Sequence, residues 1–162
     1  MTTTTPVKRR AILAFMLDRP GVLNKIAMLV RRKMYNVETL TVCKTHQPGT
    51  SRMTITLREA SDEKMGQVVR QIEKITEVIS ARELDIHASF WREVAVVKLE
   101  ADAGRVAELG KAYRFEILDN HQDERFVIQV AGTSQSIDAF LEEAGSDNIV
   151  EVARSGFTAI EK

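Results

Sequence analysis

The chain lacks several features that mark particular classes of protein. It contains one cysteine, Cys43, so no internal disulfide can form, and this usage fits a reducing, cytoplasmic setting. No apolar run approaches the roughly 20 residues that a bilayer-spanning helix needs, so we expect no membrane span. The 23 Lys and Arg residues balance the 23 Asp and Glu residues, and this balance argues against nucleic acid as the partner.

Catalytic signatures are also missing. The three histidines, His46, His87 and His121, fall in different predicted turns or linkers without metal-ligand spacing, so we expect them to be solvated at the surface. Cys43 lies in a predicted strand with no histidine close in sequence, which favours a buried small hydrophobe over a nucleophile. There is no P-loop and no G-x-G-x-x-G motif. We therefore expect a non-enzyme with no metal site and no cofactor of its own.

One order of predicted elements occurs twice along the chain. The order is strand, helix, strand, strand, helix, strand. The strands are predicted over 11–17, 37–44, 52–58 and 78–84 in the first half, and over 94–99, 115–118, 126–130 and 149–153 in the second. The repeat predicts an α+β protein of two tandem βαββαβ ferredoxin-like sandwiches, with antiparallel sheets and helices on one face. We place the domains at 9–86 and 92–158, joined near 86–92.

The second face of each sheet is predicted to be free. Residues 52–58 alternate, with Met53, Ile55 and Leu57 on one side and polar residues on the other, which predicts one buried and one wet face. Free faces and edge strands can pair with partners, so we expect a dimer. RNA-binding modules use the same element order, but neither half carries the aromatic-rich third strand with which they stack bases.

The segment LDRPGVLNKI, residues 17–26, interrupts an apolar strand and restarts as an amphipathic helix. Pro20 has no N–H to donate, and Gly21 removes the side chain at the helix entrance. The backbone amides of Gly21, Val22 and Leu23 can then approach a ligand, and a bare helix N-terminus favours a carboxylate. These residues alone leave a plain strand-to-helix turn equally open.

A family resemblance favours the ligand site. Residues 17–42 resemble the ACT domain, a small amino-acid-binding module, of the regulatory (small) subunit of acetolactate synthase. The resemblance rests on YNVETLTV (35–42), SRMTI (51–55), QIEKI (71–75), VAGT (130–133) and EVARSG (151–156). It covers roughly residues 9 to 158, which is nearly the whole chain.

The resemblance implies a non-catalytic regulatory subunit in branched-chain amino acid biosynthesis. Such a subunit activates the catalytic (large) subunit and mediates feedback inhibition by valine, leucine or isoleucine. Thiamine diphosphate, Mg and FAD would belong to the catalytic partner. The small subunits pair as homodimers through ACT sheet edges. The alternative, from another class, is a free-standing tandem ACT amino-acid sensor that regulates transcription or another enzyme.

The resemblance also implies the site residues. Gly21, Val22 and Leu23 of one protomer would hold the ligand's carboxylate, whereas Asn36 and Val37 of its partner would contact the amino group. Asp18 stands where the family commonly has a ligand-holding Asn. A carboxylate there attracts the ligand's ammonium group and repels its carboxylate, which predicts altered affinity or ligand choice.

Two further positions depart from the family pattern. Met34 stands where the family usually has Gly, which changes the backbone freedom before Asn36. The chain ends on AIEK (159–162), without the family's usual basic ending. These departures predict weakened feedback sensitivity with activation retained.

Overall fold

The computed structural model describes residues 8–59, 61–85, 87–121 and 124–162. The chain forms two compact units. The first unit extends to Phe90 and also includes Ala159–Lys162, and the second spans Trp91–Thr158. Each unit is described by itself.

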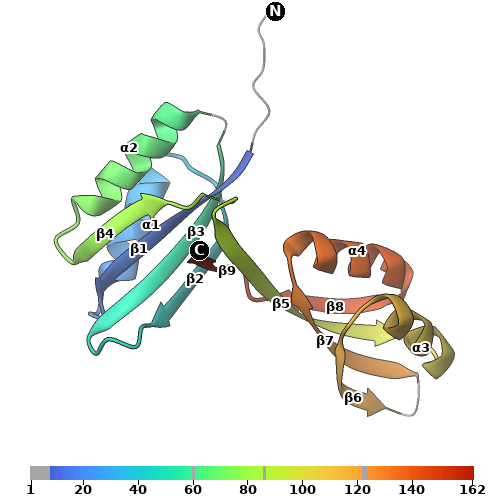
Figure 1. Cartoon of the computed structure of the whole chain (residues 1–162). Coiled ribbons are helices and arrows are strands. Elements are labelled where there is room, and N and C mark those ends of the chain that lie inside the picture. The colour runs from blue at the N-terminus through green and yellow to red at the C-terminus, as the bar shows by residue number, and fades with distance from the viewer. Residues whose placement is uncertain (1–7, 60, 86, 122–123) are drawn as a thin grey trace, which may run out of the picture. The chain divides into compact units, whose positions relative to one another are not determined.

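The first unit is a four-stranded antiparallel sheet with the strand order β2-β3-β1-β4. Its elements are β1 (Lys8–Leu17), α1 (Val22–Arg32), β2 (Val37–Lys44), β3 (Thr50–Glu59), α2 (Asp62–Glu73) and β4 (Val78–Glu83). Both helices cover one face of the sheet (Figure 1). The core lies between them, where alternate β1 and β3 residues such as Ile12 and Ile55 meet Ile26 of α1 and Ile72 of α2. In this order β2 is an edge strand, and α1 is separated from it by one short connection.

The second unit repeats this arrangement with the order β6-β7-β5-β8. Its elements are β5 (Ser89–Glu100), α3 (Ala103–Ala112), β6 (Glu116–His121), β7 (Arg125–Gly132), α4 (Ser134–Ala144), the 3-10 turn η1 (Ser146–Asn148) and β8 (Ile149–Arg154). A last strand, β9 (Thr158–Glu161), pairs with β5. Phe140 of α4 is fully buried and packs against Tyr113 and Phe115 with ring centroids 5.5 and 5.8 Å apart.

The predicted α+β class and the repeated element order are confirmed. Several ends differ. Strand β5 begins at Ser89, inside the predicted connection, of which Ile86 lies outside the described residues. Strand β6 extends through His121, beyond the predicted strand over 115–118. Strand β9 was not predicted at all.

The prediction of a wet face on the first sheet is wrong at its centre. Thr54 and Thr56 are 3% and 0% exposed, and they lie opposite Leu13 and Ala11 of β1, which are also buried. Ala159, in the C-terminal part of the same unit, is also fully buried, and its carbonyl accepts a hydrogen bond from Arg52. The end of the chain therefore reaches the face that alternation marks as polar at Arg52.

Two arginines attach this C-terminal segment to the sheet. The Arg52 side chain donates a hydrogen bond to the Ala159 carbonyl, and Arg82 forms an ion pair with Glu161 at 2.5 Å. Both guanidinium groups also lie over the Phe15 ring, at 5.9 and 6.0 Å from its centroid. Neither sequence neighbourhood shows this contact, because Arg52 and Ala159 are 107 residues apart.

Candidate ligand-binding site

The turn between β1 and α1 holds the predicted ligand loop. Gly21 adopts the left-handed conformation (φ +86°) as the N-cap of α1, and no side chain caps this helix. A Cβ atom at Gly21 would have no heavy atom within 4 Å, so the space beside the helix entrance is open. The first amides of a helix have no partner within the helix, and a left-handed Gly brings them within reach of an outside acceptor.

The other α-helices that the structure describes are closed by their own side chains. The amide of Lys64 donates to Ser61 Oγ at 3.3 Å in α2. Asp102 and Thr133 accept the equivalent bonds of α3 and α4, at 2.8 and 3.2 Å. The loop after the first strand of the chain is therefore the one where an external group can take the place of a cap.

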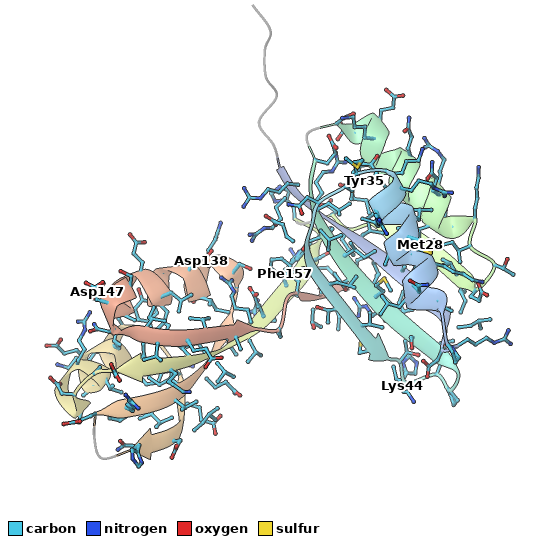
Figure 2. The ribbon with its side chains drawn as sticks, turned by 180° about the vertical axis from the view of Figure 1, so that it is seen from behind. Met28, Tyr35, Lys44, Asp138, Asp147 and Phe157 are labelled. Atoms are coloured by element: carbon cyan, nitrogen blue, oxygen red, sulfur yellow. The ribbon has the colours of Figure 1, made fainter. Side chains whose placement is uncertain are left out.

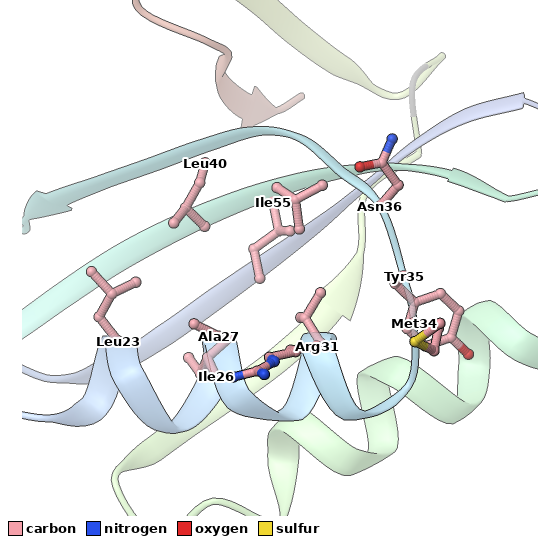
Figure 3. A pocket seen from close by; sticks show the side chains of 11 residues that line it. Leu23, Ile26, Ala27, Arg31, Met34, Tyr35, Asn36, Leu40 and Ile55 are labelled. Carbon is pink, nitrogen blue, oxygen red and sulfur yellow. The ribbon is translucent and has the colours of Figure 1, made fainter.

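A hollow of about 520 Å³ runs between α1 and the edge strand β2. Figure 3 shows its lining side chains: Leu23 and Ala27 come from the helix, and Leu40 and Ile55 come from the strands that face it. Most of them are apolar or aromatic: Leu23, Ile26, Ala27, Val30, Met34, Tyr35, Val37, Leu40 and Ile55. The two polar lining residues are Arg31 and Asn36. An apolar hollow with one amide at its rim suits a ligand with a hydrocarbon side chain and a polar end.

The structure brings three of the predicted site residues to this hollow and leaves three outside it. Leu23, Asn36 and Val37 line it. Leu23 and Asn36 lie at opposite ends of it (Figure 3), so one chain alone does not bring the loop and Asn36 to the same point. Sequence reasoning missed Leu40 as a lining residue. Leu40 alternates with Thr39 and Thr41 along β2, and this alternation indicates the side of the strand on which it lies.

Gly21, Val22 and Asp18 do not line the hollow. The Val22 side chain is buried in the core at 3% exposure, which leaves only its backbone for a ligand. Its amide is 3.5 Å from the Arg19 carbonyl, the outer limit of a hydrogen bond. Any role of Val22 in binding is therefore played by its amide rather than by its methyl groups.

The Asp18 carboxylate is turned toward the β2–β3 hairpin. Its Oδ1 accepts a hydrogen bond from Ser51 Oγ at 3.1 Å, and its Oδ2 is 3.5 Å from Lys44 Nζ. The Asp18 amide donates to the Gly49 carbonyl at 2.8 Å, which fixes the backbone of the same residue. Figure 2 shows Lys44 at the end of the first sheet from which α1 begins. Sequence reasoning missed both side-chain partners, because they lie in a different element.

A second charged group stands beside the same turn. Glu77 forms a 2.5 Å ion pair with Lys25 of α1, and its backbone carbonyl accepts from the Leu17 amide at 2.8 Å. The hydrogen bond from Lys25 holds the pKa of the Glu77 carboxyl below its usual range, and the Arg19 charge acts in the same direction. Two cations near the loop are thus engaged with Glu77, while Lys44 is engaged with Asp18.

Met34 occupies a strained position at the other end of α1. Its φ is +60°, in the left-handed region that a side chain disfavours, and its side chain is 90% exposed. It is the one residue other than glycine with positive φ in the described part of the chain. A backbone conformation that suits Gly thus precedes Asn36.

The remaining candidate residues carry no chemistry. His46, His87 and His121 are exposed, as expected. Cys43 is exposed as well, so the prediction of a buried cysteine is wrong: its place on the edge strand β2 leaves it uncovered. Within the described residues no three His, Cys, Asp or Glu side chains gather where a metal ion could bind. The helices of the described part are all too short or too polar to cross a membrane.

The topology and the loop geometry define a class, the ACT-like ferredoxin fold. Residues 12–80 match the family described as the AHAS small subunit-like ACT domain, and residues 92–162 match the family described as the small subunit of acetolactate synthase. The chain belongs to the acetolactate synthase small-subunit family, as the sequence resemblance indicated.

Relatives from distant organisms match over most of their length. A probable acetolactate synthase small subunit of Methanothermobacter thermautotrophicus is 35% identical over 93% of this chain and 91% of its own. The acetolactate synthase isozyme 3 small subunit of Escherichia coli is also 35% identical, over 95% of this chain and 96% of its own. The crystal structure of the small subunit from Thermotoga maritima is similar, with a TM-score of 0.88 and 26% identity over 96% of this chain and 98% of that one.

Proposed function

We propose that this chain is the non-catalytic regulatory subunit of an acetolactate synthase, that it binds and activates the catalytic subunit, and that a branched-chain amino acid feeds back through it. The observation that carries the proposal is that both units match this family, one behind the other, over nearly the full chain. Thiamine diphosphate, Mg and FAD belong to the catalytic partner in this proposal, and the complex works in the cytoplasm.

The amino-acid site is proposed to lie where two protomers meet at β2. The open helix entrance at Gly21 supplies amides for the carboxylate, and the apolar hollow supplies room for the side chain. Asn36 lies at the far end of the hollow from Leu23, so a second copy, paired antiparallel at β2, is what would bring Asn36 to the loop. The edge position of β2, with the half-exposed Leu40 and Val42 beside it, supports this pairing.

Activation follows from a shift of populations. A regulatory subunit raises turnover if it binds the catalytically ordered state of its partner more tightly than the other states. Linkage then requires that an inhibiting amino acid favours a different state of the regulatory dimer. The chain itself contributes no acid, base or nucleophile to the conversion of pyruvate.

The test is an activity assay with pyruvate, thiamine diphosphate and Mg. It compares the catalytic subunit alone, this chain alone and both together, with and without valine, leucine and isoleucine. Turnover should rise only in the mixture and fall when an effective amino acid is added. If the two chains form a complex and turnover does not change, the free-standing amino-acid sensor becomes the better hypothesis.

The shared pocket has its own test. Gly21→Asp and Asn36→Ala each damage one half of the proposed pocket, the second by losing one hydrogen bond to a charged group, about 1.5–3 kcal/mol. A heterodimer of the two variants has one doubly damaged pocket and one intact pocket. The isolated heterodimer should therefore have half the binding capacity of the wild type in calorimetry; heterodimers that bind nothing would refute a pocket built by two protomers.

A further inference from the structure

The loop at α1 carries a charge that opposes the ligand proposed for it. Asp18 lies three residues before Gly21, and its carboxylate would repel the carboxylate of an amino acid held at the helix entrance. The structure shows how this charge is balanced. Lys44 Nζ is 3.5 Å from Asp18 Oδ2, and the Ser51 hydroxyl, on a residue that is 5% exposed, holds the other oxygen at 3.1 Å.

Lys25 of α1 does not share this task, because it forms its ion pair with Glu77. Within the described residues, the ion pair of Asp18 is the one with Lys44. Because the Asp18 side chain is 40% exposed and that of Lys44 83% exposed, the pair is open to solvent and its charges act on whatever lies at the loop.

We propose that Lys44 is a specificity-determining residue of the amino-acid site: it neutralises Asp18 and so lets the site accept a ligand with a free carboxylate. The inference rests on the proposed function, because it needs an amino acid at the α1 entrance. Ser51 orients Asp18 toward Lys44, and Lys44 sets the sign of the local charge. Ligands that keep the ammonium group and lack the carboxylate gain nothing from Lys44.

The experiment is a double-mutant cycle on the full chain with L-valine, L-leucine and L-isoleucine as probes. Lys44→Met leaves Asp18 unbalanced and should weaken binding roughly fivefold, which corresponds to about 1 kcal/mol, the order of the interaction between two nearby charges in water. Asp18→Asn keeps an acceptor for Ser51, removes the charge and should strengthen binding by a similar factor. The double variant, like the wild type, has no net charge at the pair, and it should bind as the wild type does.

Two matched arms separate charge balance from structure. L-Valinamide keeps the ammonium group and lacks the carboxylate, so Lys44→Met should strengthen its binding while it weakens that of L-valine. Lys98→Met removes a similar exposed lysine, 3.6 Å from Glu151 in the second unit, and should change neither. Raising NaCl to about 1 M, where the Debye length is about 3 Å, should remove most of the difference.

The outcomes are distinct. A double variant that binds as weakly as Lys44→Met alone, or parallel losses for L-valine and L-valinamide, would overturn the role of Lys44 while the amino-acid site stands. If neither the wild type nor Asp18→Asn binds any of the three amino acids, the proposed site itself is wrong and the role of Lys44 falls with it.

Discussion

The two units repeat one fold and differ where the first helix of each begins. In the second unit, Asp102 caps α3 with its own carboxylate, which accepts from the Arg105 amide at 2.8 Å. In the first unit, left-handed Gly21 caps α1 and offers no side chain. The Asp102 carboxylate accepts from the amides at the start of α3, so these amides are not available to a bound carboxylate. The amides at the start of α1 have no such side-chain acceptor and remain available.

The units also differ in charge. The first unit carries 16 Lys and Arg against 10 Asp and Glu, and the second carries 7 against 13, so their formal charges are +6 and −6. The neutral total is thus the sum of two opposite charges. The balanced charge of the whole chain therefore does not describe either unit taken singly.

The largest effect is expected from a variant that places a carboxylate at the start of α1, as Asp102 already does at the start of α3. Gly21→Asp puts a carboxylate at the entrance of α1, where repulsion should abolish amino-acid binding measured by calorimetry. Gly21→Asn is the matched control, because it has the same shape and similar backbone strain without the charge, and it should retain measurable binding. Asp102→Ala removes the capping carboxylate from the second unit. It should lower the free energy of unfolding by about 1 kcal/mol and leave amino-acid binding unchanged. Equal loss in the Asp and Asn variants would contradict the electrostatic account.

A second prediction concerns the ion-pair network around Glu93 in the second unit. Glu93 is 3% exposed, and Arg154 donates to both of its oxygens at 3.0 and 2.7 Å while Ser134 donates at 2.8 Å. Glu93→Ala leaves Arg154 with only Asp138, at 2.5 Å, and should lower the free energy of unfolding by about 3 kcal/mol. Glu151→Ala, which breaks an exposed pair, should cost under about 1 kcal/mol in the same denaturant titration.

The same network gives this prediction a pH dependence. Burial of Glu93 opposes its ionisation, but the hydrogen bonds and charge of Arg154 outweigh this, and the pKa of Glu93 is lowered in the folded protein. Its contribution is therefore complete above its unfolded pKa, near 4.3, and is lost as the pH falls through the lower folded value. The gap in stability between wild type and Glu93→Ala should narrow in that acid range; a constant gap would show that Glu93 acts by packing alone.

A third prediction removes the C-terminal segment from the first unit. A chain that ends at Thr158 loses buried Ala159, the bond from Arg52 and the ion pair of Glu161, on the order of 2 kcal/mol for this unit. Glu161→Gln keeps the strand and should cost less than about 1 kcal/mol. Calorimetry of the two variants decides whether the strand or the ion pair matters. A truncated chain as stable as the wild type would show that the C-terminal segment contributes nothing to the stability of this unit.

The smallest effect is expected from relieving the backbone strain at Met34, beside the hollow. Met34→Gly frees a residue held at φ +60° and should stabilise the first unit by about 0.5–1 kcal/mol, since left-handed conformations cost a side chain roughly 1–2 kcal/mol. Met28→Gly is the contrasting variant: Met28 is also exposed but lies within α1, where Gly costs about 1 kcal/mol. Thermal melting should therefore move in opposite directions for the two.

The sequence by itself determined the repeated element order, because hydrophobic periodicity and the turn residues are local properties of the chain. It also determined the family, through motifs that extend over both units, and it located the open helix entrance, because Pro20 and Gly21 act on their own backbone. It could not show that Thr54 and Thr56 are buried, or that the end of the chain reaches Arg52 on the same strand, since Arg52 and Ala159 are 107 residues apart. Nor could it show that Lys44 and Ser51 hold Asp18, because these side chains come together only when the hairpin folds against the loop. Contacts of this kind depend on register and on long-range pairing, and these are fixed only when the sheet is assembled.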